Sequence, residues 1–331
     1  MSKILTISIA AYNVEQYLEK LLDTIIEAEC MEKLEVLVVN DGSKDGTADI
    51  ANKYHDKYPE SIFLVDKENG GHGSTINKGM ERATGKYFKV IDGDDWVDSK
   101  GLKELVDKLE NDDSDMIVTN YQECYETGDV IDKTYPMFNA GVKEKFNDVC
   151  CKVDRIVFHA VYFKTKLLQE NNIKITENCF YVDAEYVLYP IPYVDTITYY
   201  DSTVYCYRLG LMGQSVSIES LQKNINMHMK VSRNLLKFCA KVQSDLQDNV
   251  KKFVFSSVAM VNNKTFDTLL SFPCRRDTMH KIKEFDEYIK NTCSPVCEYF
   301  PNKTVRALRK NIAIMYPMAS GWVKIKRKLG R

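Results

Sequence analysis

Residues 86–95 of the chain read KYFKVIDGDD. The first part, Lys86–Ile91, is a short apolar run of the kind that forms a buried strand in a parallel sheet. It passes without a break into the acidic cluster Asp92-Gly93-Asp94-Asp95. Parallel sheets bind their ligands beyond the carboxyl ends of their strands. This stretch therefore predicts a strand of an α/β sheet and, directly after it, the centre of the functional site.

Three more strand-like runs precede this stretch and alternate with segments of helical periodicity. The strand-like runs lie at Lys3–Ala10, Leu34–Val39 and Ser61–Val65. The helical segments are predicted at 14–26, at 47–58, and from a glycine-rich loop to about Ala83. This βαβαβαβ succession predicts an α/β fold with a Rossmann-like, mostly parallel sheet flanked by helices.

Beyond the acidic cluster the pattern continues less regularly. Strands are predicted at 115–120 and 197–207, and we expect residues 121–150 to be irregular and to cover the site. From about Ser220 charged and apolar residues interleave with helical spacing. We therefore expect a catalytic domain over residues 1–218 and a mostly helical region with a basic tail over residues 219–331.

The composition narrows the class of protein. Apolar residues make up 44% of the 331 residues and the net charge is −2, so a large core is expected and binding of a polyanion by the whole chain is not. The ten cysteines lack zinc-ligand spacing, and strand-like residues begin at Lys3, so we expect no signal peptide and free thiols in a reducing compartment. No run approaches the ~20 apolar residues of a membrane span. We expect a cytoplasmic protein, either soluble or peripheral to the membrane.

The acidic cluster has the composition of a metal site. Three carboxylates at one strand end raise one another's pKa unless a cation compensates them. Mg²⁺ or Mn²⁺ prefers such oxygen ligands, and substrate phosphates usually complete its coordination. The cluster therefore predicts a diphosphate-bearing substrate. The alternative is a solvated acidic turn, which is common for so short a motif.

Polar residues follow the other predicted strands as well. Asp41 can accept hydrogen bonds from a base or ribose, or it can serve as a turn or helix-capping residue. Tyr12 can stack on a base or pack at the strand end. The loop Asn69–Gly73 opens a helix, so its N–H groups could attract phosphate. The chain has neither GxGxxG nor GxxxxGK[ST], which disfavours NAD binding and P-loop chemistry.

At these residues the chain resembles the inverting glycosyltransferases of family 2, which have the GT-A fold. Four motifs carry the resemblance in order over the first hundred residues: AYNVEQYL at 11–18, VNDGSKDGT at 39–47, Asn69-x-Gly71 through Asn77-Lys78-Gly79, and IDGDD at 91–95. A weaker likeness extends to about residue 218. The resemblance implies transfer of a sugar, with inversion, from a nucleotide-sugar donor, usually a UDP-sugar, to a glycan or lipid-linked acceptor in cell-surface polysaccharide synthesis. It also implies Mn²⁺ or Mg²⁺ as cofactor.

The resemblance assigns roles to individual residues of the donor site. Tyr12 and Asp41 would hold the nucleobase, with Ala11 and Asn69 beside them. Asp92 would lie near the ribose. Asp94 would ligate the metal ion that bridges the diphosphate, and Asp95 would support it.

The general base of the family is an aspartate in a Glu-Asp pair further along the chain. The matching stretch here is FYVDAEY at 180–186, in which Asp183 takes the base position and Val182 replaces the usual glutamate. An aspartate there would remove the proton of the acceptor hydroxyl. Glu185 is the alternative base.

A second departure concerns positive charge. Many relatives carry an arginine where this chain has Ile76. A cation near the phosphates would then come from Lys67, His72 or Arg208, each of which could equally be an ordinary surface or packing residue. His159 could reach the acceptor or could be a core histidine.

The C-terminal tail is strongly basic. Residues 301–331 hold nine Lys and Arg and no Asp or Glu. Trp322, Val323, Ile325 and Leu329 interleave with the last basic residues, which suits a helix on an anionic membrane surface. A solvated basic helix docked on the protein is the alternative. No nucleic-acid partner is expected, because no reader motif accompanies the tail.

Two other functions compete with sugar transfer. A sugar nucleotidyltransferase would resemble a chain with a glycine-rich phosphate loop directly after the first strand, and residues 10–13 read AAYN instead. A non-catalytic module that binds nucleotide sugars would keep the fold without needing its carboxylates. The aspartates at 41, 94 and 183 argue against that alternative.

Overall fold

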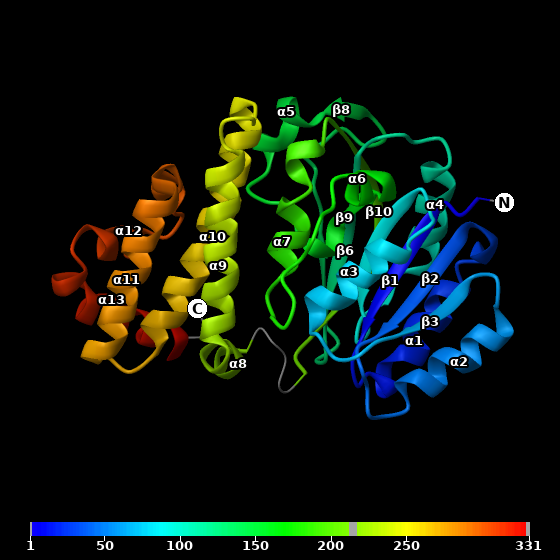
Figure 1. Ribbon diagram of the computed structural model, residues 1–331, viewed down its shortest axis with the longest axis horizontal. Coiled ribbons are helices and arrows are strands. Elements are labelled where there is room, and N and C mark those ends of the chain that lie inside the picture. The colour runs from blue at the N-terminus through cyan, green and yellow to red at the C-terminus, as the bar shows by residue number, and fades with distance from the viewer. Residues whose placement is uncertain (1, 212–216, 329–331) are drawn as a thin grey trace. The chain divides into compact units, whose positions relative to one another are not determined.

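The computed structural model describes residues 2–211 and 217–328. The chain divides into two compact units, Met1–Met212 and Gly213–Arg331, and each is described by itself (Figure 1). Among the described residues, no helix combines the length and the apolar character that crossing a bilayer requires.

The first half of unit 1 alternates strands and helices as the sequence predicts. Its elements are β1 (Leu5–Ala11), α1 (Glu15–Ile26), β2 (Leu34–Asn40), α2 (Thr47–Lys57), β3 (Ile62–Asp66), α3 (His72–Arg82) and β4 (Tyr87–Asp92). The strands pair in parallel in the order β3-β2-β1-β4. β1 and β2 are buried along almost their whole length, which explains why their sequences are continuously apolar.

The rest of the sheet is mixed. β9 (Val161–Lys164) lies antiparallel between β4 and β6 (Met116–Tyr125), and β6 pairs in parallel with β10 (Thr196–Leu209). The short β5 (Trp96–Val97) pairs antiparallel with β10. The remaining helices of unit 1 are α4 (Ser99–Leu109), α5 (Phe146–Val149), α6 (Thr165–Glu170) and α7 (Asp183–Leu188). The predicted α/β class with flanking helices is confirmed, with a mixed sheet.

The expectation of irregular structure over 121–150 was wrong for much of the stretch, although residues 134–142 form neither a helix nor a named strand. β6 continues to Tyr125, then turns at Gly128 into β7 (Val130–Lys133), and β8 (Lys143–Lys145) pairs with the edge of β10. The side chains of β7 and β8 are largely exposed, so these strands show no alternation of apolar and polar residues. Periodicity alone therefore misses them.

Unit 2 is helical, as predicted from Ser220 onward. Its helices are α8 (Ile218–Lys223), α9 (Ile225–Val242), α10 (Asp248–Ser271), α11 (Arg276–Cys293), α12 (Lys303–Lys310) and α13 (Ile312–Lys328). α10 contacts α9, α11, α12 and α13 and is buried on most sides. It is therefore the central helix of this unit.

Candidate active site

The carboxyl ends of the four parallel strands lie at one edge of the sheet. Ala11 is in register with Asn40, Asn40 with Asp66, and Ala10 with Asp92. The polar clusters that follow β1, β2 and β4 therefore converge there. This convergence is the feature that the sequence pattern predicted.

The loops after β1 and β2 are tied to each other. Asn13 has a φ of +52°, and its backbone N–H donates to Ser43 Oγ at 2.9 Å. The backbone N–H of Lys44 donates to Asn13 Oδ1 at 2.8 Å. Ala11 is buried and its carbonyl accepts from the backbone N–H of Asp41 at 2.8 Å. Tyr12, in contrast, is 50% exposed, so its ring is open to a ligand.

Asp41 organises the glycine-rich loop. Its Oδ1 accepts hydrogen bonds from Lys67 Nζ at 2.6 Å and from the backbone N–H of Gly70 at 2.9 Å, and its Oδ2 accepts from Gly71 N–H at 2.8 Å. Asn69 Nδ2 donates to the Asp41 carbonyl at 2.9 Å. The predicted nucleobase residues are thus adjacent, and the Asp41 carboxylate already has several donors from the protein.

The glycines of this loop allow a close approach between two chain segments. Gly71 has a φ of +77°, and a Cβ on Gly73 would lie only 2.1 Å from the carbonyl oxygen of Thr176. The backbone N–H of Asn178 donates to the Gly70 carbonyl at 2.5 Å. Asn77 Nδ2 donates to the Ile175 carbonyl at 2.9 Å. The third motif therefore fastens residues 175–178, which lead directly to Asp183.

The three aspartates after β4 have different surroundings. Asp95 is buried: its Oδ2 accepts from the Tyr205 hydroxyl at 2.5 Å and its Oδ1 from the Arg208 N–H at 2.7 Å. Burial and the charges of Asp94 and Asp92 raise the pKa of Asp95 well above its usual range. Asp95 therefore supports the turn from within.

Asp94 is the carboxylate best placed to hold a cation. Burial and the neighbouring charge of Asp92 raise the pKa of Asp94 to about 6, so a divalent ion at this point would relieve the crowding. Among the residues that the structure describes, no three His, Cys, Asp or Glu side chains converge on a common metal position. The donor set fits a hard ion held by one carboxylate and completed by substrate phosphates and water.

His72 lies between two carboxylates. Its Nε2 is 2.9 Å from Asp92 Oδ1, and its Nδ1 is 3.7 Å from Asp183 Oδ1. At 2.9 Å the Nε2–Oδ1 contact is within hydrogen-bond distance, and it is an ion pair when the ring is protonated. Burial opposes a charge on the ring, but the carboxylates of Asp92, Asp183 and Asp94 outweigh it and raise the pKa of His72 to about 9. A protonated His72 therefore links the two sides of the site.

Asp183 and Glu185 differ sharply in exposure. Asp183 is the first residue of α7, and 54% of its side chain is exposed, although the surrounding protein still raises its pKa. Glu185 is fully buried, and its carboxylate accepts from Thr176 N–H at 2.7 Å and from Thr176 Oγ1 at 2.9 Å. An acceptor hydroxyl can reach Asp183, whereas Glu185 anchors the preceding loop.

The other candidate cations have structural partners. Lys67 pairs with Asp41, and Arg208 donates to the Asp94 carbonyl at 2.8 Å and to Glu126 at 3.0 Å. His159 stacks on Tyr207 with 4.1 Å between ring centroids, and burial lowers the pKa of His159 to about 3. This packing favours the core-histidine interpretation.

Lys89, which lies beneath the site, was not predicted from the sequence as a functional residue. Lys89, in the middle of β4, is 1% exposed, and its Nζ donates to the carbonyls of Phe158 at 2.9 Å and His159 at 2.7 Å. Burial lowers the pKa of Lys89 well below its usual range, against the charges of Asp92 and Asp95. Its signal in the sequence was a lysine inside a strand that must be buried on both faces.

The chain shares sequence with known glycosyltransferases. The model of the family "Glycosyl transferase family 2" matches residues 6–172. EpsH, a putative glycosyltransferase of Bacillus subtilis (strain 168), is 34% identical over 125 residues, which are 38% of this chain and 36% of EpsH. The match thus spans about a third of that relative. A cholesterol galactosyltransferase of Borreliella burgdorferi is 25% identical over 265 residues, covering 75% of this chain and 71% of the relative.

A solved structure shares the fold along the chain. S. aureus TarS 1–349, crystallised in complex with UDP, matches with a TM-score of 0.65 and 17% sequence identity, covering 99% of this chain and 92% of that one. At this identity the likeness shows the GT-A fold alone.

Proposed function

This chain belongs to glycosyl transferase family 2, and on that premise we propose that it transfers a sugar from a nucleotide-sugar donor to a glycan or lipid-linked acceptor, with inversion at the anomeric carbon. One observation carries the proposal. A half-exposed carboxylate, Asp183, faces Asp92 across His72 at the edge where the donor motifs converge. A single displacement needs a base that faces the diphosphate side of the donor site.

The donor is proposed to be a UDP-sugar. Tyr12 would stack on the base, while Asp41 and Asn69 would line the base site through the loop that they hold together. Asp92 would lie beside the ribose. The support is the exposure of Tyr12 and the complex of the structural neighbour TarS with UDP.

Mn²⁺ or Mg²⁺ is proposed as the cofactor, with Asp94 as its protein ligand. A bound divalent ion would stabilise negative charge on the diphosphate. The support is the raised pKa of Asp94, which burial and the charge of Asp92 cause against the opposing charges of Arg208 and His72. Arg208 would fix the position of this carboxylate, because its Nε holds the Asp94 carbonyl.

Asp183 is proposed as the general base. Its carboxylate takes the proton of the acceptor hydroxyl while that oxygen bonds to the anomeric carbon and the bond from that carbon to the diphosphate breaks. The charge on His72 favours the ionised form of Asp183 and also fixes the distance between the base and the donor side. His72 is thus proposed as a positioning residue.

The acceptor is proposed to approach along β6 and β7, as part of cell-surface polysaccharide synthesis. A hollow of about 390 Å³ there is lined by Tyr121, Lys133, Tyr135 and Arg155, among others. Tyr121 contacts the His159 ring, which in turn stacks on Tyr207. Aromatic and basic side chains suit a sugar that carries anionic groups.

The test is a donor screen. The full chain is incubated with UDP-, GDP- and dTDP-sugars and Mn²⁺ or Mg²⁺, and release of the free nucleoside diphosphate is followed. We expect slow release from one class of donor without acceptor and faster release with it. Neither release nor binding with any donor would overturn the proposal, and release of inorganic pyrophosphate from a sugar phosphate and a nucleoside triphosphate would favour a nucleotidyltransferase.

A further inference from the structure

Helix α13 exposes a row of apolar side chains. Ile314 is 65% exposed, Met318 58%, Trp322 50% and Ile325 52%. Their spacing of four, four and three residues places them on one face of the helix. From Ile312 to Val323 the sequence contains no charged residue. We call these four side chains the α13 apolar row.

The opposite face of α13 holds the helix on unit 2. Tyr316, Ala319 and Ser320 are buried. The Tyr316 hydroxyl accepts from the backbone N–H of Arg275 at 3.2 Å, and Ser320 Oγ donates to the Leu270 carbonyl at 3.3 Å. The packing of α13 on the other helices of unit 2 therefore buries one face of the helix only, and it leaves the α13 apolar row exposed.

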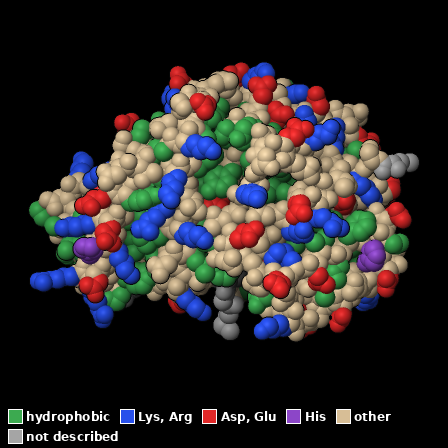
Figure 2. All heavy atoms as spheres, in the orientation of Figure 1, with side chains coloured by type: hydrophobic (Ala, Val, Ile, Leu, Met, Phe, Trp, Pro, Cys, Tyr) green, Lys and Arg blue, Asp and Glu red, His purple; other side chains and the backbone are tan. Residues whose placement is uncertain are grey.

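Positive charge accompanies this row in the sequence. Residues 301–331 carry nine Lys and Arg and no acidic residue, and the side chains of Lys303, Arg306 and Lys310 on α12 are exposed. Figure 2 shows Lys and Arg side chains beside apolar ones on the surface of this unit. The side chains of Lys324 and 326–328 and all of Leu329 lie outside what the structure describes.

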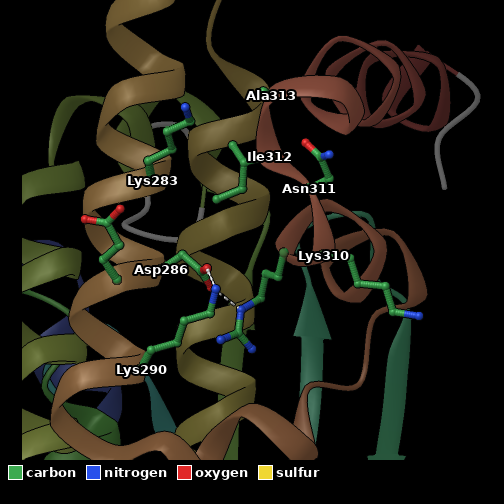
Figure 3. A pocket seen from close by; sticks show the side chains of 9 residues that line it. Lys283, Asp286, Lys290, Lys310, Asn311, Ile312 and Ala313 are labelled. Carbon is green, nitrogen blue, oxygen red and sulfur yellow. Dashed lines mark hydrogen bonds and ion pairs between the residues drawn. The ribbon is translucent and has the colours of Figure 1, made fainter.

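A hollow of about 270 Å³ lies between α11, the end of α12 and the first turn of α13 (Figure 3). Arg309 and Lys290 pair with the buried Asp286 at its base. Lys283 and Lys310 also line it, and Figure 3 shows both pointing away from that ion pair. Glu287 lines it as well, and Ile312 and Ala313 line it from the side of α13 that faces away from the α13 apolar row, so the hollow is no part of that surface.

We propose that α13 lies on an anionic lipid bilayer, with the α13 apolar row in the headgroup boundary and the basic residues of the tail near the lipid phosphates. A second copy of the chain fits less well, because it would bring two basic surfaces together. Nucleic acid would leave the apolar row exposed. The contact would thus begin at Ile314, eight residues before Trp322, where the pattern over 322–329 begins.

Vesicle co-sedimentation with the full chain tests the proposal without any donor or acceptor. The vesicles contain phosphatidylcholine alone or phosphatidylcholine with phosphatidylglycerol. The variant Ile314→Ser/Met318→Ser/Trp322→Ser should bind the anionic vesicles about tenfold more weakly than the parent chain. Val142→Ser, which removes an exposed apolar side chain elsewhere on unit 1, is the matched control and should bind like the parent. Circular dichroism establishes that all chains are folded.

A second readout locates the contact. Tryptophan fluorescence of the parent chain should shift to shorter wavelength on anionic vesicles, and Trp322→Phe should lose that shift, because Trp96 is the only other tryptophan. Equal binding to neutral and anionic vesicles, or undiminished binding by the triple variant, would overturn the proposal. A concentration-dependent dimer that the triple variant abolishes would assign the α13 apolar row to a second copy instead.

Discussion

The carboxylates of the candidate active site form two regions with opposite properties. The floor consists of Asp41, Asp95 and Glu185, which are buried and accept hydrogen bonds from surrounding donors. The rim consists of Asp92, Asp94 and Asp183, which are partly or largely exposed, and two of them, Asp92 and Asp183, contact His72. The difference separates residues that build the site from residues that are available to a substrate.

The largest effect should come from the rim residue Asp183. Asp183→Asn removes the proposed base but keeps the shape of the side chain, so kcat should fall about a thousandfold while donor binding stays unchanged. Kinetics with a saturating donor and calorimetric titration of the donor measure both. Asp201→Asn, a change at an exposed aspartate of the same unit, is the control. Near-normal kcat in Asp183→Asn would break the distinction between rim and floor.

Asp94 should have the next largest effect. Asp94→Asn should lower kcat on the order of a hundredfold and weaken activation by Mn²⁺, because it removes the proposed protein ligand. Titration of activity with Mn²⁺ after treatment with a chelator measures this. A variant with the same metal dependence as the parent chain would move the metal site away from the rim.

The floor residue Glu185 should affect folding rather than chemistry. Glu185→Gln leaves the Thr176 N–H and hydroxyl with a weaker acceptor in a fully buried place, so the free energy of unfolding should fall by about 1–3 kcal/mol. Urea denaturation measures it, with the exposed Glu170→Gln as control. A stable Glu185→Gln protein that has lost its activity would instead make Glu185 the base.

The smallest effect should be a shift in pH dependence. The charge of His72 lowers the pKa of Asp183, so in His72→Gln that pKa should rise and the acid limb of the kcat profile should move to higher pH. Catalysis at the optimum should fall about tenfold through poorer positioning. An unchanged acid limb would mean that the charge of His72 does not act on the pKa of Asp183.

His72 should also make stability depend on pH. Its pKa is raised from 6.5 to about 9, so its contribution is complete below pH 6.5 and is lost as the pH rises through about 9. The melting temperature of the parent chain should fall over this window relative to His72→Gln. Parallel curves for the two proteins would contradict this sign.

The sequence predicted the outline of the site better than its internal contacts. The position of Asp92 and Asp94 at the end of a strand was enough to predict the edge of the sheet at which they lie, because the carboxyl ends of parallel strands share one edge. The double contact of His72 depends on the proximity of α3 and α7, which no local pattern encodes. Lys89 was predictable in principle, because a lysine in a strand covered on both faces must find internal acceptors.

The strands of the sheet also differ in how well the sequence predicts them. Continuous apolar runs identified β1 and β2, whereas β7 and β8 are short, exposed strands whose residues follow no two-residue period. Such strands form because a partner strand supplies their hydrogen bonds, so their signal lies in tertiary structure.

The close contact between Gly73 and Thr176 also restricts how this protein can be re-engineered. A Cβ at position 73 would collide with the carbonyl of Thr176, and Asn178 N–H binds the Gly70 carbonyl. Segments 69–73 and 175–179 therefore have to be exchanged together. A chimera that imports only one of them from a relative would inherit a mismatched backbone, whereas a transplant of both together would carry its own fit.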